Sequence, residues 1–161
     1  MRSPAPSSSN PDREGLYRAM RPRVEALIAG APDLLAAMAN TAAVLHAALG
    51  VHWTGFYRAQ GDALLLGPFQ GPPACDRLPF GRGVCGTAWQ QGRTLVVPDV
   101  DLFPGHIACS ALSRSEIVVP VRDPAGTTIA VLDIDSAVPD GFSAVDARYL
   151  EPICDLLGSR A

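Results

Sequence analysis

The spacing of the apolar residues changes at Gly50, and this change restricts the possible folds more than any other feature of the chain. Between residues 11 and 49 apolar side chains recur every three or four positions, as in helices that bury one face. From Val51 onward they alternate with other residues, as in strands. The chain therefore begins with helices and continues as a sheet, which predicts an α+β fold.

The same patterns predict the individual elements. Helices are expected over residues 11–30, where Pro22 should kink or split the helix, over 31–49, ended by Gly50, and over 84–91 and 143–157. One hairpin is expected from strands 51–58 and 63–69, and a second from strands 116–122 and 127–135, with a short strand at 94–97. Ser143 and Asp146 have the spacing of a capping box. We expect a mainly antiparallel sheet flanked by helices.

The domain limits follow from length and composition. Residues 1–10 are dominated by Ser and Pro and are predicted to form a disordered tail, and residues 11–161 are predicted to form a single domain. Residues 67–83 and 100–115 are predicted to be long loops, the second with a possible helical turn. Long ordered loops in so small a domain are usually functional.

Composition excludes several classes of function. The net charge of -3 argues against a broad nucleic-acid surface. No apolar run approaches the roughly 20 residues of a membrane-spanning helix, and the N-terminus has no apolar segment typical of a secretory signal. We therefore expect a cytoplasmic protein, in which cysteines are more often thiols than permanent disulfides.

Three of the four cysteines lie in or beside the predicted loops, namely Cys75, Cys85 and Cys109. Cys154 falls in the apolar stripe of the last helix and is predicted to pack in the core. No CxxC pair exists, and the HxxC pair of His106 and Cys109 alone is a weak zinc signature, so a metal site is not expected. Thiol redox chemistry suits the three loop cysteines better, with one attacking and a neighbour resolving.

His106 has two interpretations. It could act as a base for Cys109, but a loop histidine that bonds a backbone carbonyl is the more common arrangement.

Acidic residues gather on one side of the second hairpin. Alternation places Asp133 and Asp135 on one strand face, opposite a face of apolar residues, and Glu116 opens the partner strand. A solvated face is the ordinary alternative, although such a face usually mixes charges. An acidic pocket could hold an ammonium group, or could keep one carboxyl protonated because like charges raise each other's pKa.

The first predicted strand carries aromatic rings on the face of Gly55. Trp53 and Tyr57 flank that glycine, which should leave a gap between them, whereas Phe56 points to the core. The rings could surround a small apolar group such as a methyl next to sulfur. Simple core filling by both rings is equally compatible with the pattern.

Several motifs together resemble a known family. Residues 53–57 read WTGFY, and GPFQG, GRGVCGTA, GHIAC, SEIV and VLDIDS follow in that order within residues 66–136. A generic GAF domain does not carry these motifs together. The chain is similar to the free methionine-(R)-sulfoxide reductases, which are built on a single GAF domain, and the resemblance covers almost everything after the tail.

The resemblance implies an activity and its partners. Members of the family reduce free L-methionine (R)-S-oxide to L-methionine without a cofactor, are recycled by thioredoxin and are usually homodimers. Cys109 would attack the sulfoxide sulfur and become a sulfenic acid, and Cys75 would resolve it as a disulfide. Cys85 would lie near the pocket as a possible alternative partner.

The resemblance also implies roles for the acids and the rings. Glu116, Asp133 and Asp135 would bind the substrate amino group, and Glu116 and Asp135 would assist protonation of the sulfoxide oxygen. Trp53 and Tyr57 would embrace the S-methyl group.

One departure and one competing interpretation accompany the resemblance. The residue after GHIAC is Ser110 here, where the family usually has Asp. The competing interpretation is a non-catalytic GAF domain that binds a small ligand or senses redox state. A cyclic-nucleotide ligand is disfavoured, because three acids would repel phosphate.

Overall fold

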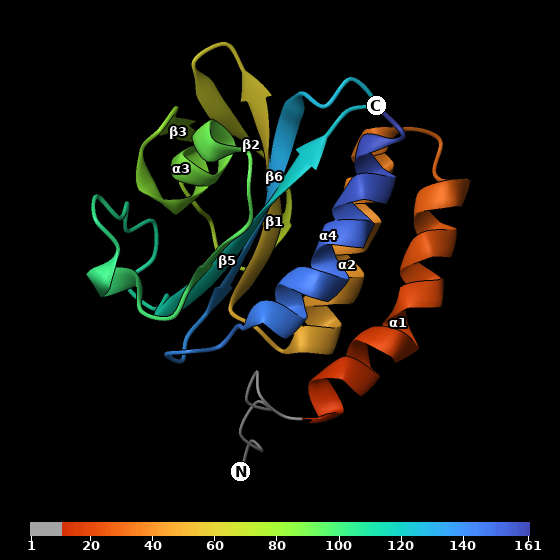
Figure 1. Ribbon diagram of the computed structural model, residues 1–161, viewed down its shortest axis with the longest axis horizontal. Helices are drawn as coiled ribbons and strands as arrows, with labels where there is room; N and C mark the ends of the chain where they lie inside the picture. The colour runs from red at the N-terminus through yellow and green to blue at the C-terminus, as the bar shows by residue number, and fades with distance from the viewer. Residues whose placement is uncertain (1–10) are drawn as a thin grey trace.

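The computed structural model describes residues 11–161, and Figure 1 shows their arrangement. In chain order the elements are α1 (Pro11–Gly30), α2 (Leu34–Leu49), β1 (Trp53–Gln60), β2 (Ala63–Gln70), β3 (Arg77–Pro79), α3 (Gly83–Gln91), β4 (Leu95–Val97), the 3-10 turn η1 (Val100–Leu102), β5 (Ser115–Arg122), β6 (Thr128–Ser136) and α4 (Ala144–Gly158). The predicted α+β fold is confirmed. The predicted tail, residues 1–10, lies outside the described residues.

The strands form one sheet with the order β3-β2-β1-β6-β5-β4, and every neighbouring pair is antiparallel. Helices α1, α2 and α4 lie on one side of this sheet, and α3 lies on the other (Figure 1). Helices therefore cover both faces of the sheet, and the two faces differ in what they contain. The three-helix side holds the larger apolar core, and the α3 side holds the candidate site.

Alternation along β1 and β6 assigns side chains to these two faces as predicted. Phe56, Leu132 and Ile134 are fully buried in the core under the three helices. Tyr57 and Val131 belong to the second apolar cluster, on the α3 side. Side chains that point to opposite faces in succession explain why one strand can serve both a core and a site.

Beyond shifts of one or two residues at strand and helix ends, three differences from the prediction concern how the elements are built. Strand β3 lies inside the expected loop 67–83, as a three-residue edge strand paired with β2. Helix α2 begins at Leu34 because the carboxylate of Asp33 caps it, accepting from the Ala36 N–H at 2.8 Å. Pro22 does not split α1; it is exposed, so water can satisfy the carbonyl that loses its helical partner.

A buried polar cluster fastens α1 to the start of α4. Asp146 accepts hydrogen bonds from Arg13 Nε at 2.8 Å and from the Tyr17 hydroxyl at 2.6 Å. The predicted capping box of Ser143 and Asp146 is present. Because Asp146 is fully buried, these partners replace the water that its carboxylate gives up on folding.

Cys154, on α4, is completely buried in the core between the sheet and the three helices, as predicted. Burial raises the pKa of its thiol above the ordinary value, so this thiol is inert. Among residues 11–161, no helix has the length and apolar character needed to cross a membrane.

Candidate active site

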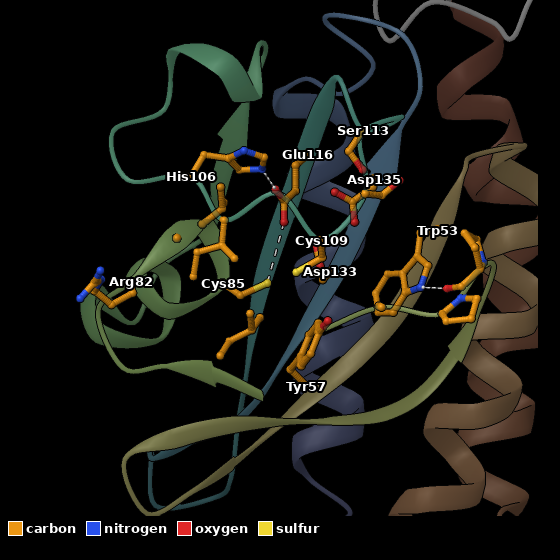
Figure 2. Close-up of a pocket in the computed structure, with 18 residues that line it drawn as sticks. Trp53, Tyr57, Arg82, Cys85, His106, Cys109, Ser113, Glu116, Asp133 and Asp135 are labelled. Carbon is orange, nitrogen blue, oxygen red and sulfur yellow. Dashed lines mark hydrogen bonds and ion pairs between the residues drawn. The ribbon is translucent and has the colours of Figure 1, made fainter. Parts of the chain in front are cut away.

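A cavity of about 50 Å³ lies on the α3 side of the sheet. Its walls contain side chains from several elements: Trp53 and Tyr57 from β1, Cys85 from α3, Cys109 from the loop before β5, Glu116 from β5, and Asp133 and Asp135 from β6 (Figure 2). Seven of the eight predicted site residues therefore line one cavity, although they are spread over more than 80 positions of the sequence. The eighth, Cys75, joins them through a disulfide.

Cys75 and Cys109 are bonded to each other, with their Cα atoms 5.4 Å apart. The two residues belong to different loops, 34 positions apart, and the fold brings these loops together over the cavity. This is the pairing that the family resemblance implied. A disulfide between two partly buried loop cysteines at a cavity mouth is typical of a redox-active pair rather than of a structural staple.

The three acids meet because β5 and β6 are paired in register. Glu116 lies directly opposite Asp135, and Asp133 is two positions farther along β6 on the same face. Glu116 and Asp133 are each only 5% exposed. One carboxyl oxygen of Asp133, Oδ1, is buried without a hydrogen-bond partner among the described residues. The alternative of a solvated face is thus excluded, and the three acids form a buried cluster.

Burial changes the protonation of these carboxyls. Loss of water raises the pKa of Glu116 well above its ordinary value, and the neighbouring charges of Asp133 and Asp135 raise it further. Burial likewise raises the pKa of Asp133. The pKa of Asp135 is raised well above its ordinary value by burial and then by Asp133, while a hydrogen bond with Ser113 acts in the opposite sense. The carboxyls of the cluster therefore keep their protons to higher pH than exposed carboxyls do, which suits a proton donor.

Cys85 contacts the acid cluster from α3. Its Sγ lies 3.8 Å from Glu116 Oε1, and the thiol is free and buried. Burial raises the pKa of this thiol well above its ordinary value, and the charges of the nearby acids raise it further. Cys85 is therefore a protonated thiol in the apo site, which distinguishes it from an activated nucleophile.

His106 lies on the other side of Glu116. Its Nε2 is 3.9 Å from Glu116 Oε2, and the side chain is mostly buried. Neither of the two arrangements considered from the sequence, a backbone-bound histidine or a base for Cys109, describes this contact. His106 instead faces the same carboxyl as Cys85, and the dashed lines of Figure 2 mark both contacts.

The aromatic pair lies on β1 beside the acids of β6, because Trp53 is the cross-strand partner of Asp135. Trp53 and Tyr57 stack with centroids 5.8 Å apart, and both are buried. The Trp53 ring itself fills the space at Gly55, because a Cβ there would lie 2.5 Å from that ring. The gap expected between the rings is thus closed by Trp53 and by Phe69, whose ring stacks on Trp53 with centroids 5.3 Å apart.

Both rings also hold the loop that carries Cys75. Trp53 Nε1 donates to the carbonyl oxygen of Pro72 at 3.1 Å, and the Tyr57 hydroxyl donates to the carbonyl oxygen of Cys75 at 2.9 Å. The aromatic pair therefore sets the position of the loop in addition to lining the cavity.

Ser110 connects the other loop to β1. Its hydroxyl lies 3.1 Å from His52 Nε2 and accepts from the Leu112 N–H at 3.2 Å. The backbone N–H of His52 in turn donates to the backbone carbonyl oxygen of Asp135 at 3.0 Å. The sequence analysis did not predict that His52, Arg82 and Ser113 lie at this site. The only signal in this part of the site was Ser110, which replaces the usual Asp of the family motif.

Within the described residues, the donor atoms of Cys85, Glu116 and Asp133 lie within 4.8 Å of one another and could hold a metal ion. The spacing of the cysteines in sequence gave no sign of such a group, because its members come from three separate elements.

Comparisons with known proteins identify the family. A family model described as GAF domain matches residues 29–159. The chain is 48% identical over 129 residues to the free methionine-R-sulfoxide reductase of Escherichia coli K12, covering 80% of this chain and 78% of the relative. It is 40% identical over 158 residues to the Saccharomyces cerevisiae protein of the same name, covering 93% and 88%.

A solved structure is equally similar. The X-ray structure of the free methionine-R-sulfoxide reductase of Neisseria meningitidis, in complex with its substrate, matches with a TM-score of 0.90 and 52% identity, covering 94% of this chain and 92% of that one. The chain therefore belongs to the GAF domain family and, within it, to the free methionine-R-sulfoxide reductases.

Proposed function

We propose that this protein reduces free L-methionine (R)-S-oxide to L-methionine, using Cys109 as the nucleophile and Cys75 as the resolving thiol. The observation that carries the proposal is the Cys75–Cys109 disulfide at a cavity with three buried carboxyls. A redox pair, a proton source and an acidic binding surface are what the reaction needs. Relatives with this name, at 40% to 48% identity, support the same assignment.

In the first step, the thiolate of Cys109 attacks the sulfoxide sulfur, and the oxygen must be protonated to leave it. The carboxyls of Glu116 and Asp135 are the proposed proton donors, because their raised pKa values keep protons available near neutral pH. The products are methionine and the sulfenic acid of Cys109. The sulfoxide sulfur is thereby reduced and the cysteine sulfur oxidised by the same two electrons.

In the second step, the thiol of Cys75 attacks the sulfenic acid, which forms the disulfide and releases water. The Cys75–Cys109 disulfide, with Cα atoms 5.4 Å apart, supports this pairing, and Cys85 is a free thiol. Because the attacking group is the free thiolate of Cys109, the disulfide must be reduced before the next turnover. We propose thioredoxin as the dithiol that opens it, a homodimer as the assembly and the reducing cytoplasm as the compartment.

The buried acids also account for a preference for free methionine over a methionine residue. A free amino acid carries an ammonium group, which can pair with carboxylates that have lost their water. Asp133 is the first candidate for this contact, because its buried Oδ1 has no hydrogen-bond partner within residues 11–161. A peptide-bound substrate would leave the acids unpaired, at a cost of several kcal/mol. Trp53 and Tyr57 are proposed to contact the S-methyl group.

Single-turnover experiments on cysteine variants test this assignment of roles. The reduced protein should form about one equivalent of methionine without added reductant, and Cys75→Ser should retain that first equivalent but fail in recycling by thioredoxin. Cys109→Ser should form none, and Cys154→Ser, altered in the core, should behave as wild type. Methionine formation by Cys109→Ser would move the nucleophile to another thiol, and normal recycling of Cys75→Ser would move the resolving role to Cys85.

A further inference from the structure

The contact between Cys85 and the acids is unused by the proposed reaction. Cys85 is neither the proposed nucleophile nor the proposed resolving thiol, and its side chain is only 4% exposed. Its Sγ points at Glu116 from helix α3, as Figure 2 shows. A buried thiol among carboxyls therefore needs a separate explanation.

We propose that Cys85, Glu116 and Asp133 form a binding site for Zn²⁺, and that the bound ion excludes the substrate. The ion is not a cofactor in this proposal. It is an inhibitor that occupies the groups on which the proposed reaction depends. The inhibition rests on the proposed function, whereas the binding of Zn²⁺ does not.

The distances suit a small divalent ion. The three ligand atoms lie within 4.8 Å of one another, and Cys85 Sγ is 3.8 Å from Glu116 Oε1. Zinc bonds of about 2.0–2.3 Å in a tetrahedron place ligand atoms roughly 3.5 Å apart. Small side-chain rotations would thus complete three bonds, and a water molecule can take the fourth position, as at zinc sites with three protein ligands.

An unpartnered atom independently indicates that this cluster receives a cation. Asp133 Oδ1 is fully buried and makes no hydrogen bond with the described residues, although a buried carboxyl oxygen normally has a partner. The substrate ammonium would satisfy this oxygen, but it would gain nothing from a thiol at the other side of the cluster. A zinc ion uses both the oxygen and the sulfur, because it binds thiolate and carboxylate ligands together.

The sulfur also decides which ion is favoured. Magnesium and calcium prefer oxygen ligands and larger coordination numbers, which a site of two carboxylates and one thiolate does not supply. Binding of Zn²⁺ would release the Cys85 proton, so no redox partner is required. The ion would then compete with the substrate ammonium for Asp133 and would block proton donation by Glu116.

Absorption spectroscopy with Co²⁺ as a zinc probe tests the site without any turnover. The oxidised protein is used, because its Cys75–Cys109 disulfide removes those two sulfurs as ligands. One equivalent of Co²⁺ should produce a near-ultraviolet thiolate charge-transfer band and intense visible bands of a tetrahedral site, and Zn²⁺ should abolish both. Among the described residues, Cys154 is the only other free cysteine. Cys154→Ser removes its thiol as a possible ligand and should retain the bands.

Cys85→Ser should lose the charge-transfer band and weaken Zn²⁺ binding by more than the roughly 10- to 100-fold that loss of an outer-shell partner costs. Glu116→Gln, which keeps the side-chain shape, should weaken binding at least about 10-fold and serves if Cys85→Ser does not fold. No band in wild type, or a band that persists in Cys85→Ser, would overturn the proposal.

Competition tests the consequence. In a Cys75→Ser, Cys109→Ser double variant, free L-methionine should weaken the apparent Zn²⁺ affinity, whereas N-acetylmethionine, which lacks the ammonium, should not. Unchanged affinity with L-methionine would overturn substrate exclusion. Because the cobalt bands do not depend on catalysis, failure of the site is distinguishable from failure of the proposed function, which is measured separately as methionine formed by the reduced wild-type protein.

Discussion

Replacement of Glu116 by Gln should make the protein less sensitive to rising pH. The wild-type carboxyl is buried beside two other acids, and its pKa in the folded protein is well above the ordinary value. In the unfolded chain the same group ionises near pH 4. Below that pH both states hold the proton. Above it the unfolded state gives up the proton first, so the free energy of unfolding falls until the folded pKa is passed.

The magnitude follows from one proton. The free energy of unfolding should fall by about 1.4 kcal/mol for each pH unit over which the folded protein alone keeps that proton. Asp133 and Asp135 add losses of the same sign, because their pKa values are also raised. Glu116→Gln removes one titrating group and its charge from the cluster. The slope of stability against pH should therefore become shallower by up to about 1.4 kcal/mol per pH unit.

Urea denaturation of the oxidised protein between pH 4.5 and 8 measures this slope. The matched control is Asp62→Asn, because the Asp62 side chain is 92% exposed and faces only Arg77 at 3.4 Å. The curve for Glu116→Gln should rise relative to wild type as the pH increases, whereas the control should run parallel to wild type. Parallel curves for Glu116→Gln would refute the reasoning, since Glu116 would then ionise alike in both states.

Other features give predictions of their own. Gly55→Ala should destabilise by about 1–3 kcal/mol in urea and alter the near-ultraviolet signal of Trp53, because the new Cβ would lie 2.4 Å from Phe69 Cβ; Gly15→Ala, in open space, should do neither. Asp146→Ala should cost about 3–5 kcal/mol, because Arg13 is left buried and unpaired; Glu25→Ala, at an exposed ion pair, should cost under about 1 kcal/mol, and similar losses would contradict this account. Tyr57→Phe should lengthen the life of the Cys109 sulfenic acid, trapped with dimedone, because Cys75 loses its anchor; an unchanged trapped fraction would argue against it.

The layout of the elements could be predicted because each depends on local signals. A period of three to four residues, the glycine at position 50 and the capping box of Ser143 and Asp146 all lie within a few positions of the structure they determine. Strand β3 was missed for the complementary reason. It has only three residues in a Pro- and Gly-rich segment, and its pairing with β2 rather than its own composition makes it a strand.

The site could be predicted only in part. Alternation placed Asp133 and Asp135 on one face, but their burial depends on α3 and the loops, which are distant in sequence. The partnership of Cys75 and Cys109 came from family resemblance, because spacing alone did not distinguish among three loop cysteines. The contact of Cys85 with Glu116 and the hydrogen bond of His52 with Ser110 join residues 31 and 58 positions apart. No local pattern encodes such contacts.

The most direct test of the proposed activity is substrate discrimination by the reduced protein. Free L-methionine (R)-sulfoxide, its (S) epimer and a peptide-bound sulfoxide would be incubated separately with a thiol reductant, and the methionine formed would be quantified. The account predicts turnover of the free (R) epimer alone. Absence of turnover with all three, while the thiols of Cys75 and Cys109 remain titratable, would contradict it and leave a ligand-binding GAF domain.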